Sequence, residues 1–378
     1  MKENILNYPT VDLNEAGDAV LIIDQTLLPK KLEMIELKGA KELWDAIYLL
    51  KVRGAPAIGV FAAYALYVLS LEIAKQASTA KEFYEEFKKQ KEYLNSARPT
   101  AVNLSWALER MERICEKGLS GAILPGAAKG SGTSSSGSPD DVGMIRETLS
   151  LLKEEAVSIH REDTETCRKI GEYGLGLIKP GYGILTHCNA GQLATSKYGT
   201  ATAPIYLAHE KGYDLKVYAD ETRPLLQGAR LTASELSAAG LDVTLLCDNM
   251  SGSLMRSGAV NAVFVGCDRV AMNGDVANKI GTSMVATLAK YYGVPFYVCA
   301  PTSTLDPSTK DGSLIRIEQR PASEITEMWY SERMAPEGIS VYNPAFDVTD
   351  HDLVTAIITE RGIAYPPYEE SLPEMLER

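Results

Sequence analysis

From residue 183 onward the sequence alternates between short apolar runs and amphipathic segments, and this alternation restricts the possible folds more than any other feature. The apolar runs have the length of buried strands, and the segments between them have helical spacing. The expected strands are 183–187, 215–219, 243–247, 262–266 and 295–299, and the expected helices are 193–211, 225–239, 253–257 and 282–292. Because each helix would return the chain to the start of another strand, the pattern predicts an α/β fold with a doubly wound, mostly parallel, Rossmann-like sheet.

The sequence before this alternation predicts a smaller, mainly helical domain. Short strands are expected within residues 1–30, and the helices that follow them are expected at 41–51, 81–94 and 102–115. Residues 144–178 have helical spacing throughout, which is typical of one long helix or two shorter ones. We therefore expect a helical N-terminal domain at 1–150 and a Rossmann-like α/β domain at 151–378. Within the first domain, the Gly/Ser-rich segment 118–140 has too few apolar residues to offset its ordering entropy, which predicts a mobile loop.

One uncharged segment, residues 54–71, is almost long enough to cross a bilayer. It contains Pro56 and Gly59, however, and Arg53 and Glu72 bracket it closely. We therefore interpret it as the buried core helix of a soluble protein, and we expect no association with a membrane.

Composition excludes several classes of partner and cofactor. A formal net charge of −12 would repel nucleic acid and anionic membranes over most of the surface. The six cysteines include no CxxC pair, which favours a reducing, cytoplasmic compartment, and with only four histidines we expect no metal centre. No signal peptide is evident at the N-terminus. Neither GxGxxG nor GxxxxGK[ST] occurs, so the sequence gives no indication of a nucleotide cofactor.

Polar residues follow each expected strand of the C-terminal sheet, and the carboxyl ends of parallel strands are where small molecules bind. These residues are Cys188, Asn189, Asp220, Glu221, Asp248, Asn249, Asp268, Pro301 and Thr302. Cys188 precedes an expected helix whose N-terminus would lower the pKa of the thiol, although a small buried side chain is the other interpretation. Asp268 ends an apolar run whose low polarity would raise the pKa of the carboxyl, although it could also cap the next loop. Cys247 and Cys267 lie within apolar runs, and we expect them in the core.

Several basic and amide residues precede expected helices, where backbone amides attract anions. Arg53 lies just before the helix that Pro56 starts, and Arg98 lies in a turn with Pro99. Lys279, next to Asn278, could likewise hold a phosphate, and Gln227 opens the helix after the second strand. The alternative for the two arginines is that they are solvated at helix ends.

Motifs along most of the chain resemble the methylthioribose-1-phosphate isomerase family. The motifs are RGAPAIG (53–59), ARPTAVNL (97–104), LTHCNAG (185–191), ADETRPLLQGARLTASEL (219–236), CDNM (247–250), VGCDRVAMNGDVANKIGT (265–282) and YNPAFDVT (342–349). The similarity runs from about residue 20 to residue 370. Residues 120–140 depart from the family pattern, so the role of that loop is unassigned. The same superfamily contains the regulatory subunits of the translation-initiation exchange factor and ribose-1,5-bisphosphate isomerase.

The resemblance implies an aldose–ketose isomerase of methionine salvage, an intramolecular oxidoreductase. It would convert 5-methylthioribose 1-phosphate to 5-methylthioribulose 1-phosphate without a metal or an organic cofactor, and it would act as a homodimer. By position, Cys188 matches the family's catalytic cysteine and Asp268 its proton donor. The family's substrate-binding positions correspond to Arg53, Gly54, Ala55, Arg98, Gln227, Asn278 and Lys279. Two alternatives remain open, which are an isomerase of another 5-substituted pentose 1-phosphate such as 5-deoxyribose 1-phosphate, and a non-catalytic regulatory subunit.

Overall fold

The computed structural model describes residues 4–99, 101–120 and 139–377, and these form two compact units. The N-terminal unit comprises residues 8–164, and the C-terminal unit comprises residues 165–377 together with the short segment 4–7. Most of the predicted mobile loop at 118–140 lies outside the described residues. The long helix α6, Pro139–Leu175, continues through residue 150 without a break, so the chain has no linker there. The domain division at residue 150 stays a prediction.

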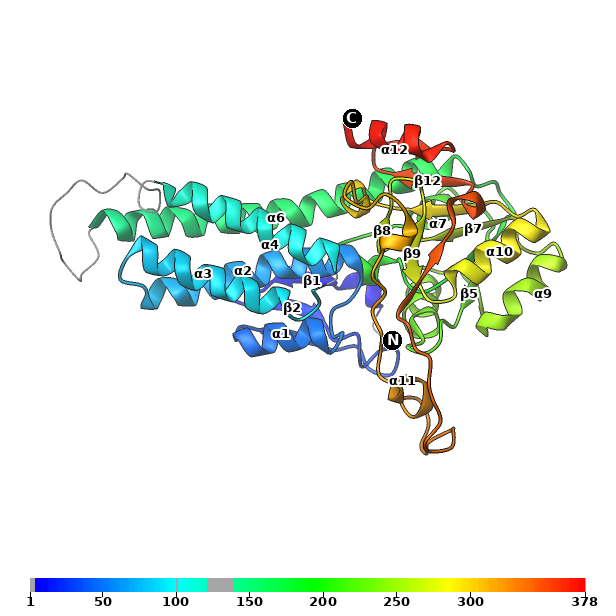
Figure 1. Ribbon diagram of the computed structural model, residues 1–378, viewed down its shortest axis with the longest axis horizontal. Helices are drawn as coiled ribbons and strands as arrows, with labels where there is room; N and C mark the ends of the chain where they lie inside the picture. Colours follow the sequence, from blue (N-terminus) through cyan, green and yellow to red (C-terminus); the bar gives the residue numbers. More distant parts are fainter. Residues whose placement is uncertain (1–3, 100, 121–138, 378) are drawn as a thin grey trace. The chain divides into compact units, whose positions relative to one another are not determined.

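A seven-stranded sheet forms the centre of the C-terminal unit, with the order β13-β12-β10-β7-β4-β5-β6 (Figure 1). All neighbouring strands pair in parallel except β12 and β13. The strands are β4 (Gly183–Thr186), β5 (Lys216–Asp220), β6 (Asp242–Leu246), β7 (Ala262–Val265), β10 (Phe296–Cys299), β12 (Ala356–Thr359) and β13 (Gly362–Ala364). The predicted α/β class with a mostly parallel sheet is therefore confirmed, and the five expected strands are all present.

Helices cover both faces of this sheet, because alternate strand residues point to opposite sides. Ile184 of β4 packs in a cluster with Ile170 of α6, Ile205 of α7 and Leu236 of α8. Its neighbour Leu185 packs in the other cluster, with residues of α9, α10 and α12. The helices are α7 (Ala203–Glu210), α8 (Ala233–Ala238), α9 (Ser251–Arg256), α10 (Thr282–Tyr292) and α12 (Tyr368–Glu377). Figure 1 shows α9 and α10 side by side at the edge of this unit.

Two of the expected helices are wrong in extent. The first half of 193–211 is not an α-helix, because the 3₁₀ turn η2 (Gln192–Ala194) is followed by an irregular segment before α7. Tyr198 and Gly199 both have positive φ in this segment, which interrupts the helical path that apolar spacing alone suggested. The expected helix 225–239 is divided into a π-helical turn, η3 (Gly228–Thr232), and α8.

A second, three-stranded sheet in the C-terminal unit was not expected from the sequence. It has the antiparallel order β11-β9-β8, with β8 at Arg269–Val270, β9 at Val276–Lys279 and β11 at Phe346–Thr349. Gly274 has a φ of 92° in the turn between β8 and β9, a conformation that favours glycine. The chain between β10 and β11 is mostly irregular and contains α11 (Ser323–Thr326).

The N-terminal unit combines an antiparallel three-stranded sheet with helices. Its elements are β1 (Val11–Leu13), β2 (Val20–Ile23), β3 (Met34–Leu37), α1 (Ala40–Tyr48), α2 (Ala55–Gln76), α3 (Ala80–Asn95), α4 (Val102–Gly118) and the first part of α6. The core of this unit is α2, which packs against α3 and α4 and against β1 and β2. Among the described helices, α2 is the one that is long and apolar enough to cross a membrane, but most of it is buried inside its unit. The expected core helix is thus buried.

Candidate active site

Strands β4 and β7 lie side by side at the point where the order in which the chain adds strands to the sheet reverses. From β4 the chain proceeds outward to β5 and β6, and it then returns to the opposite side of β4 as β7. The crevice at such a reversal, beyond the carboxyl ends of the strands, is the usual ligand-binding position in open α/β sheets. Cys188 follows β4, and Asp268 follows β7. Leu185 of β4 pairs with Val263 of β7, so Cys188 and Asp268 follow neighbouring strands of the sheet.

Cys188 has a strained but firmly held backbone. Its φ is 64°, which costs a non-glycine residue on the order of 1–3 kcal/mol. Two threonines hold this conformation, because the amide of Cys188 donates to Oγ1 of Thr222 (2.8 Å) and Oγ1 of Thr232 donates to its carbonyl (2.6 Å). The cysteine is half-buried. The long helix expected behind it is replaced by the three-residue turn η2, so activation of the thiol by a helix N-terminus has no support.

Asp268 lies between the main sheet and the smaller one. Its amide donates to the carbonyl of Ala277 in β9 (2.9 Å), and its residue is half-buried. Gly266, at the end of β7, allows the segment after Cys188 to approach closely, because a Cβ at Gly266 would lie 2.6 Å from the Cβ of Ala190.

Gln227 is buried directly before η3, the element that also carries Thr232. Its Oε1 atom has no hydrogen-bond partner among the described residues. A buried acceptor without a partner costs about 1–3 kcal/mol, which is a reason to expect a ligand donor there. The π-helical turn η3 begins very close to β5, since a Cβ at Gly228 would lie 1.7 Å from the carbonyl oxygen of Asp220.

Asn278 and Lys279 are the last residues of β9, in the same unit as Cys188 and Asp268. The side-chain amide of Asn278 donates to Oγ1 of Thr282 (3.0 Å). The ammonium of Lys279 donates to the carbonyl of Ala345 (2.9 Å) and lies 4.3 Å from the centre of the Phe346 ring. The side chain of Asn278 is therefore anchored at the start of α10, and that of Lys279 at the start of β11.

The remaining predicted site residues belong to the N-terminal unit. Arg53 is buried, and its Nε donates to Oε1 of Gln25 (3.2 Å). Gly54 is the N-cap of α2 with a φ of 94°, and Ala55 is the first residue of that helix. Arg98 is half-buried in the turn between α3 and α4. The structure thus places Arg53, Gly54 and Ala55 together at one helix start, as the sequence suggested.

Two acidic residues at the strand ends, Asp220 and Asp248, accept hydrogen bonds from other groups of the protein. Asp248 accepts hydrogen bonds from the amides of Thr222 and Arg223, both at 2.7 Å. Asp220 is fully buried and accepts from Oγ of Ser251 (2.6 Å), and its other oxygen lies 3.0 Å from Nδ1 of His187. Within the described residues, His187, Asp220 and Asp248 are the group of possible ligand atoms closest together, all within 4.8 Å. Because protein donors occupy their oxygens, we interpret them as a hydrogen-bond network rather than a metal centre.

The sequence assigned no role to His187, although it lies next to Cys188 in the same motif. Its importance depends on partners 33 and 93 positions away, which no local pattern reveals. The expectation for Cys247 was wrong, because this cysteine is exposed. It follows the edge strand β6, whose own residues are exposed or half-buried. Cys267 is half-buried, and burial raises the pKa of its thiol to about 12, so the thiol stays protonated near neutral pH.

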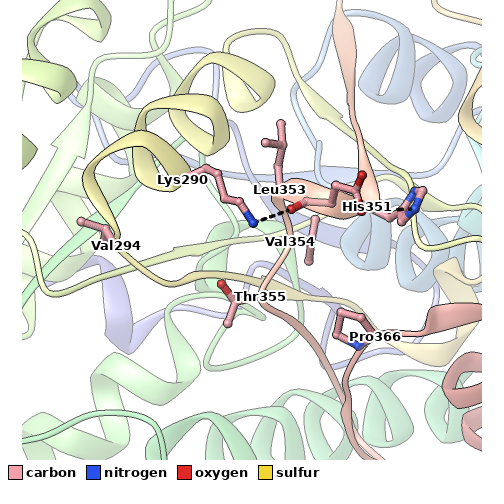
Figure 2. A pocket seen from close by; sticks show the side chains of 8 residues that line it. Lys290, Val294, His351, Leu353, Val354, Thr355 and Pro366 are labelled. Carbon is pink, nitrogen blue, oxygen red and sulfur yellow. Dashed lines mark hydrogen bonds and ion pairs between the residues drawn. The ribbon is translucent and has the colours of Figure 1, made fainter.

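A cavity of about 370 Å³ lies at the amino ends of the strands, away from these residues. Lys290, Val294, Thr355 and Pro366 line it, and the ammonium of Lys290 donates to the carbonyl of Asp352 (3.3 Å), as Figure 2 shows. None of the predicted site residues contributes to its wall. It is therefore unrelated to the strand ends that carry Cys188 and Asp268.

Curated relatives resemble this chain over nearly its whole length. The methylthioribose-1-phosphate isomerase of Symbiobacterium thermophilum is 57% identical over 97% of this chain and 96% of its own. The enzyme of the same name from Parabacteroides distasonis is 59% identical, covering 93% of this chain and 98% of its own. The 5-deoxyribose 1-phosphate isomerase of Petrotoga mobilis is 50% identical, covering 97% of this chain and 99% of its own.

Solved structures show the same similarity. The 5-methylthioribose 1-phosphate isomerase of Pyrococcus horikoshii OT3 is 40% identical, with a TM-score of 0.84 over 98% of this chain and 96% of that one. A protein of A. fulgidus described as translation initiation factor eIF-2B, subunit delta, is also 40% identical, with a TM-score of 0.80 over 98% and 99%. The model of the initiation factor 2 subunit family matches residues 51–366. Since that match covers most of the sequence, this chain belongs to the initiation factor 2 subunit family.

Proposed function

We propose that this protein is an aldose–ketose isomerase that converts 5-methylthioribose 1-phosphate to 5-methylthioribulose 1-phosphate, a reaction of methionine salvage. The observation that carries the proposal is the position of Cys188 and Asp268 after the adjacent strands β4 and β7, where the strand order reverses. Relatives that are 57% and 59% identical bear the corresponding name. At the carboxyl ends of these strands the carboxyl supplies a proton donor for ring opening, and the thiol supplies a base for one of the two routes described below.

The chemistry begins with ring opening. The phosphate on C1 prevents the spontaneous opening of a free hemiacetal, so the bond between C1 and the ring oxygen must be broken. In the proposed mechanism Asp268 donates a proton to the ring oxygen, which becomes the C4 hydroxyl, and C1 is left electron-deficient. A neutral carboxyl can act as this acid, and its carboxylate then receives the proton that the C2 hydroxyl loses when it becomes a ketone. The acid is thereby regenerated, and the substrate and product are isomers.

Hydrogen must also move from C2 to C1, and two routes balance. In one route the hydrogen moves directly with its electron pair. In the other, Cys188 as a thiolate removes it as a proton and returns a proton to C1 through an enediol. Substrate deuterated at C2 distinguishes them, because the direct shift retains all the deuterium at C1 in ordinary water, whereas the enediol route loses part of it to solvent.

The substrate-binding groups that we propose are cationic side chains, backbone amides and side-chain amides. Arg53, Arg98 and Lys279 would neutralise the phosphate within a protein of net charge −12. The backbone at Gly54 and Ala55 offers amides at the start of α2, where anions are favoured. Gln227 and Asn278 would contact the sugar hydroxyls.

Turnover assays with two substrates test the proposal. We expect a higher kcat/KM for 5-methylthioribose 1-phosphate than for 5-deoxyribose 1-phosphate. The reverse preference would support the second candidate, which relatives such as the Petrotoga mobilis enzyme at 50% identity favour. Turnover of neither substrate would support a non-catalytic regulatory subunit, the class suggested by the name of the A. fulgidus protein.

The remaining features of the proposal concern partners and location. We infer a homodimer in the cytoplasm, and no binding to nucleic acid or to membranes, because a net charge of −12 opposes both of these surfaces. Light scattering coupled to gel filtration would measure the oligomeric state directly.

A further inference from the structure

The side chain of His187 has no contact with solvent and both of its ring nitrogens face acceptors. It follows β4 and is fully buried. Nδ1 lies 3.0 Å from Oδ2 of Asp220, the last residue of β5. Nε2 lies 2.9 Å from the carbonyl oxygen of Ile280, which follows β9. A carbonyl oxygen can only accept a hydrogen bond, so Nε2 must carry a proton.

The surrounding charges place a proton on Nδ1 as well. One oxygen of Asp220 already accepts from Oγ of Ser251, which leaves the other to face the ring, and Asp248 brings a second carboxyl group within 4.8 Å. A neutral ring would turn the lone pair of Nδ1 toward the oxygen of Asp220, which is repulsive. The carboxylates of Asp220 and Asp248 raise the pKa of His187 against the opposing effect of burial.

His187 also connects the two segments that carry proposed active-site residues. Its main chain continues directly into Cys188, while its ring is bonded to the residue that follows Lys279. Gly281 packs against the ring, since a Cβ there would lie 2.9 Å from Cε1 of His187, and its own φ of 102° favours glycine. The imidazole therefore occupies the space between the end of β4 and the turn after β9.

We propose that His187 is a positioning residue, which carries protons on both ring nitrogens and clamps the turn after Lys279 to the end of the strand that bears Cys188. This inference rests on the proposed isomerase function, because it assigns the clamp to a site made by Cys188, Asn278 and Lys279. The clamp fixes the phosphate-binding lysine and its neighbour relative to the thiol. Misplacing a binding or reacting group by about 1 Å costs up to ~100-fold in rate, so such a clamp affects catalysis.

The charged groups near the ring determine the direction of its pH dependence. Asp220 of β5 and Asp248, which follows β6, face it on one side. On the other side, Asp347 of β11 accepts from the amide of Gly281, and Lys279 points away to Ala345. Because the pKa of His187 is raised in the folded protein, both bonds of the ring are present below the ordinary histidine pKa, and the bond from Nδ1 to Asp220 that orients the clamp is lost as the pH rises through the raised value.

Nitrogen NMR of the intact protein with labelled histidine tests the protonation state without any substrate. The chain has four histidines, so each can be assigned by substitution. His160 is an internal control, because its pKa is lowered by burial and it is therefore neutral at pH 7. We expect protons on both nitrogens of His187 at pH 7. A bare nitrogen in this ring at pH 7 would overturn the proposal.

Two matched substitutions test the clamp itself. The amide nitrogen of glutamine corresponds to Nε2, so His187→Gln keeps the donor to Ile280, whereas the amide of His187→Asn corresponds to Nδ1 and loses it. We expect His187→Asn to raise KM for the sugar phosphate about tenfold or more, with His187→Gln closer to wild type and without the alkaline loss of kcat/KM. Equal effects of the two substitutions, or none, would contradict the clamp. His209→Gln in α7 serves as the control and should keep the KM of the wild type. Inactivity of the wild type with any pentose phosphate would instead refute the proposed function.

Discussion

At the scale of single residues, the proposed function depends on Cys188 and Asp268 acting in the reaction. We predict that Cys188→Ser and Asp268→Asn each lower kcat by about 10²- to 10⁴-fold, the usual contribution of a positioned acid or base. Cys247→Ser is the matched control, since this exposed cysteine follows the edge strand β6 of the same sheet, and it should retain full activity. Steady-state kinetics on variants with unchanged circular dichroism would measure these effects. Near-normal turnover in either site variant would remove the assigned role.

A second residue-scale prediction concerns the support of Arg53. Its Nε donates to Oε1 of the buried Gln25 at 3.2 Å, so loss of that acceptor would remove one of the bonds that orient the guanidinium. We predict that Gln25→Met raises KM for the sugar phosphate severalfold with little change in kcat, because binding in the ground and transition states is reduced alike. Gln25→Glu retains an acceptor and should restore KM. If both variants bind substrate as the wild type does, Gln25 has no part in orienting Arg53.

Local sequence patterns predicted the residues that follow strands and failed for those defined by distant partners. Cys188 and Asp268 were identifiable because apolar runs end beside them. His187 and Gln25 were not, since their roles depend on Asp220, Ile280 and Arg53, which are far away in the sequence. The apolar run that forms β6 likewise did not predict that this strand lies at the edge of the sheet or that Cys247 is exposed.

At the scale of elements, the close approach of the segment after Cys188 to β7 should be intolerant of side chains. A Cβ at Gly266 would lie 2.6 Å from that of Ala190, so Gly266→Ala must displace the segment. We predict a loss of kcat/KM of about 100-fold at temperatures where the variant is still folded. Gly143→Ala in α6 is the control, because its Cβ meets nothing within 4 Å and should stabilise the helix by ~0.5–1 kcal/mol. Unchanged kinetics in Gly266→Ala would show that this contact does not position Cys188.

The turn between β8 and β9 carries an ion pair whose contribution should depend on pH. Asp275 and the imidazole of His351 lie 2.8 Å apart, and this hydrogen bond raises the pKa of His351. Against the opposing effect of burial, hydrogen bonds from Asn273, from the amide of Gly312 and from His351 together lower the pKa of Asp275. The raised histidine pKa means that its contribution is complete below the ordinary histidine value and disappears as the pH rises through the folded value. The lowered aspartate pKa means that its contribution is lost as the pH falls through the folded value.

We therefore predict that His351→Gln reduces thermal stability in weakly acidic solution and has less effect in alkaline solution. The reduction should stay below about 1 kcal/mol, because His351 is 38% exposed and solvent screens the pair. Thermal melts of the wild type and the variant across the pH range would test this. A difference that does not change with pH would exclude the ion pair as its cause.

Element prediction succeeded where a segment had one period throughout and failed where turns intervened. The run 282–292 coincides with α10, because its spacing, its preceding Gly281 and its following Gly293 all agree with a helix. Residues 193–211 contain helical spacing that the positive φ of Tyr198 and Gly199 interrupts. The β8–β9–β11 sheet was missed because β8 has two residues and β11 pairs with β9 from far along the chain, beyond α10 and β10.

At the scale of the whole molecule, the proposed substrate-binding residues come from both compact units. Arg98 belongs to the N-terminal unit, and Lys279 belongs to the C-terminal unit. A ligand at 100 times its Kd stabilises a folded protein by about 2.7 kcal/mol. We predict that 5-methylthioribulose 1-phosphate raises the Tm of the wild type, and that Arg98→Ala and Lys279→Ala each reduce this rise. Lys216→Ala, at an exposed position in β5, should leave it unchanged.

Differential scanning fluorimetry at fixed protein and ligand concentrations would measure these rises. If only one of the variants Arg98→Ala and Lys279→Ala reduces the rise in Tm, the unit that carries the other residue does not contribute to binding. A rise that persists in both variants would place the ligand elsewhere, and the cavity of Figure 2 would then be the first position to examine.

The central claim is that the ends of β4 and β7 form the site of isomerisation, and a crystal structure with bound 5-methylthioribulose 1-phosphate tests it most directly. We predict the sulfur of Cys188 and the carboxyl of Asp268 within about 3–3.5 Å of the reacting sugar atoms. We also predict the phosphate in contact with arginine and lysine side chains. A sugar phosphate bound away from both Cys188 and Asp268 would contradict the claim.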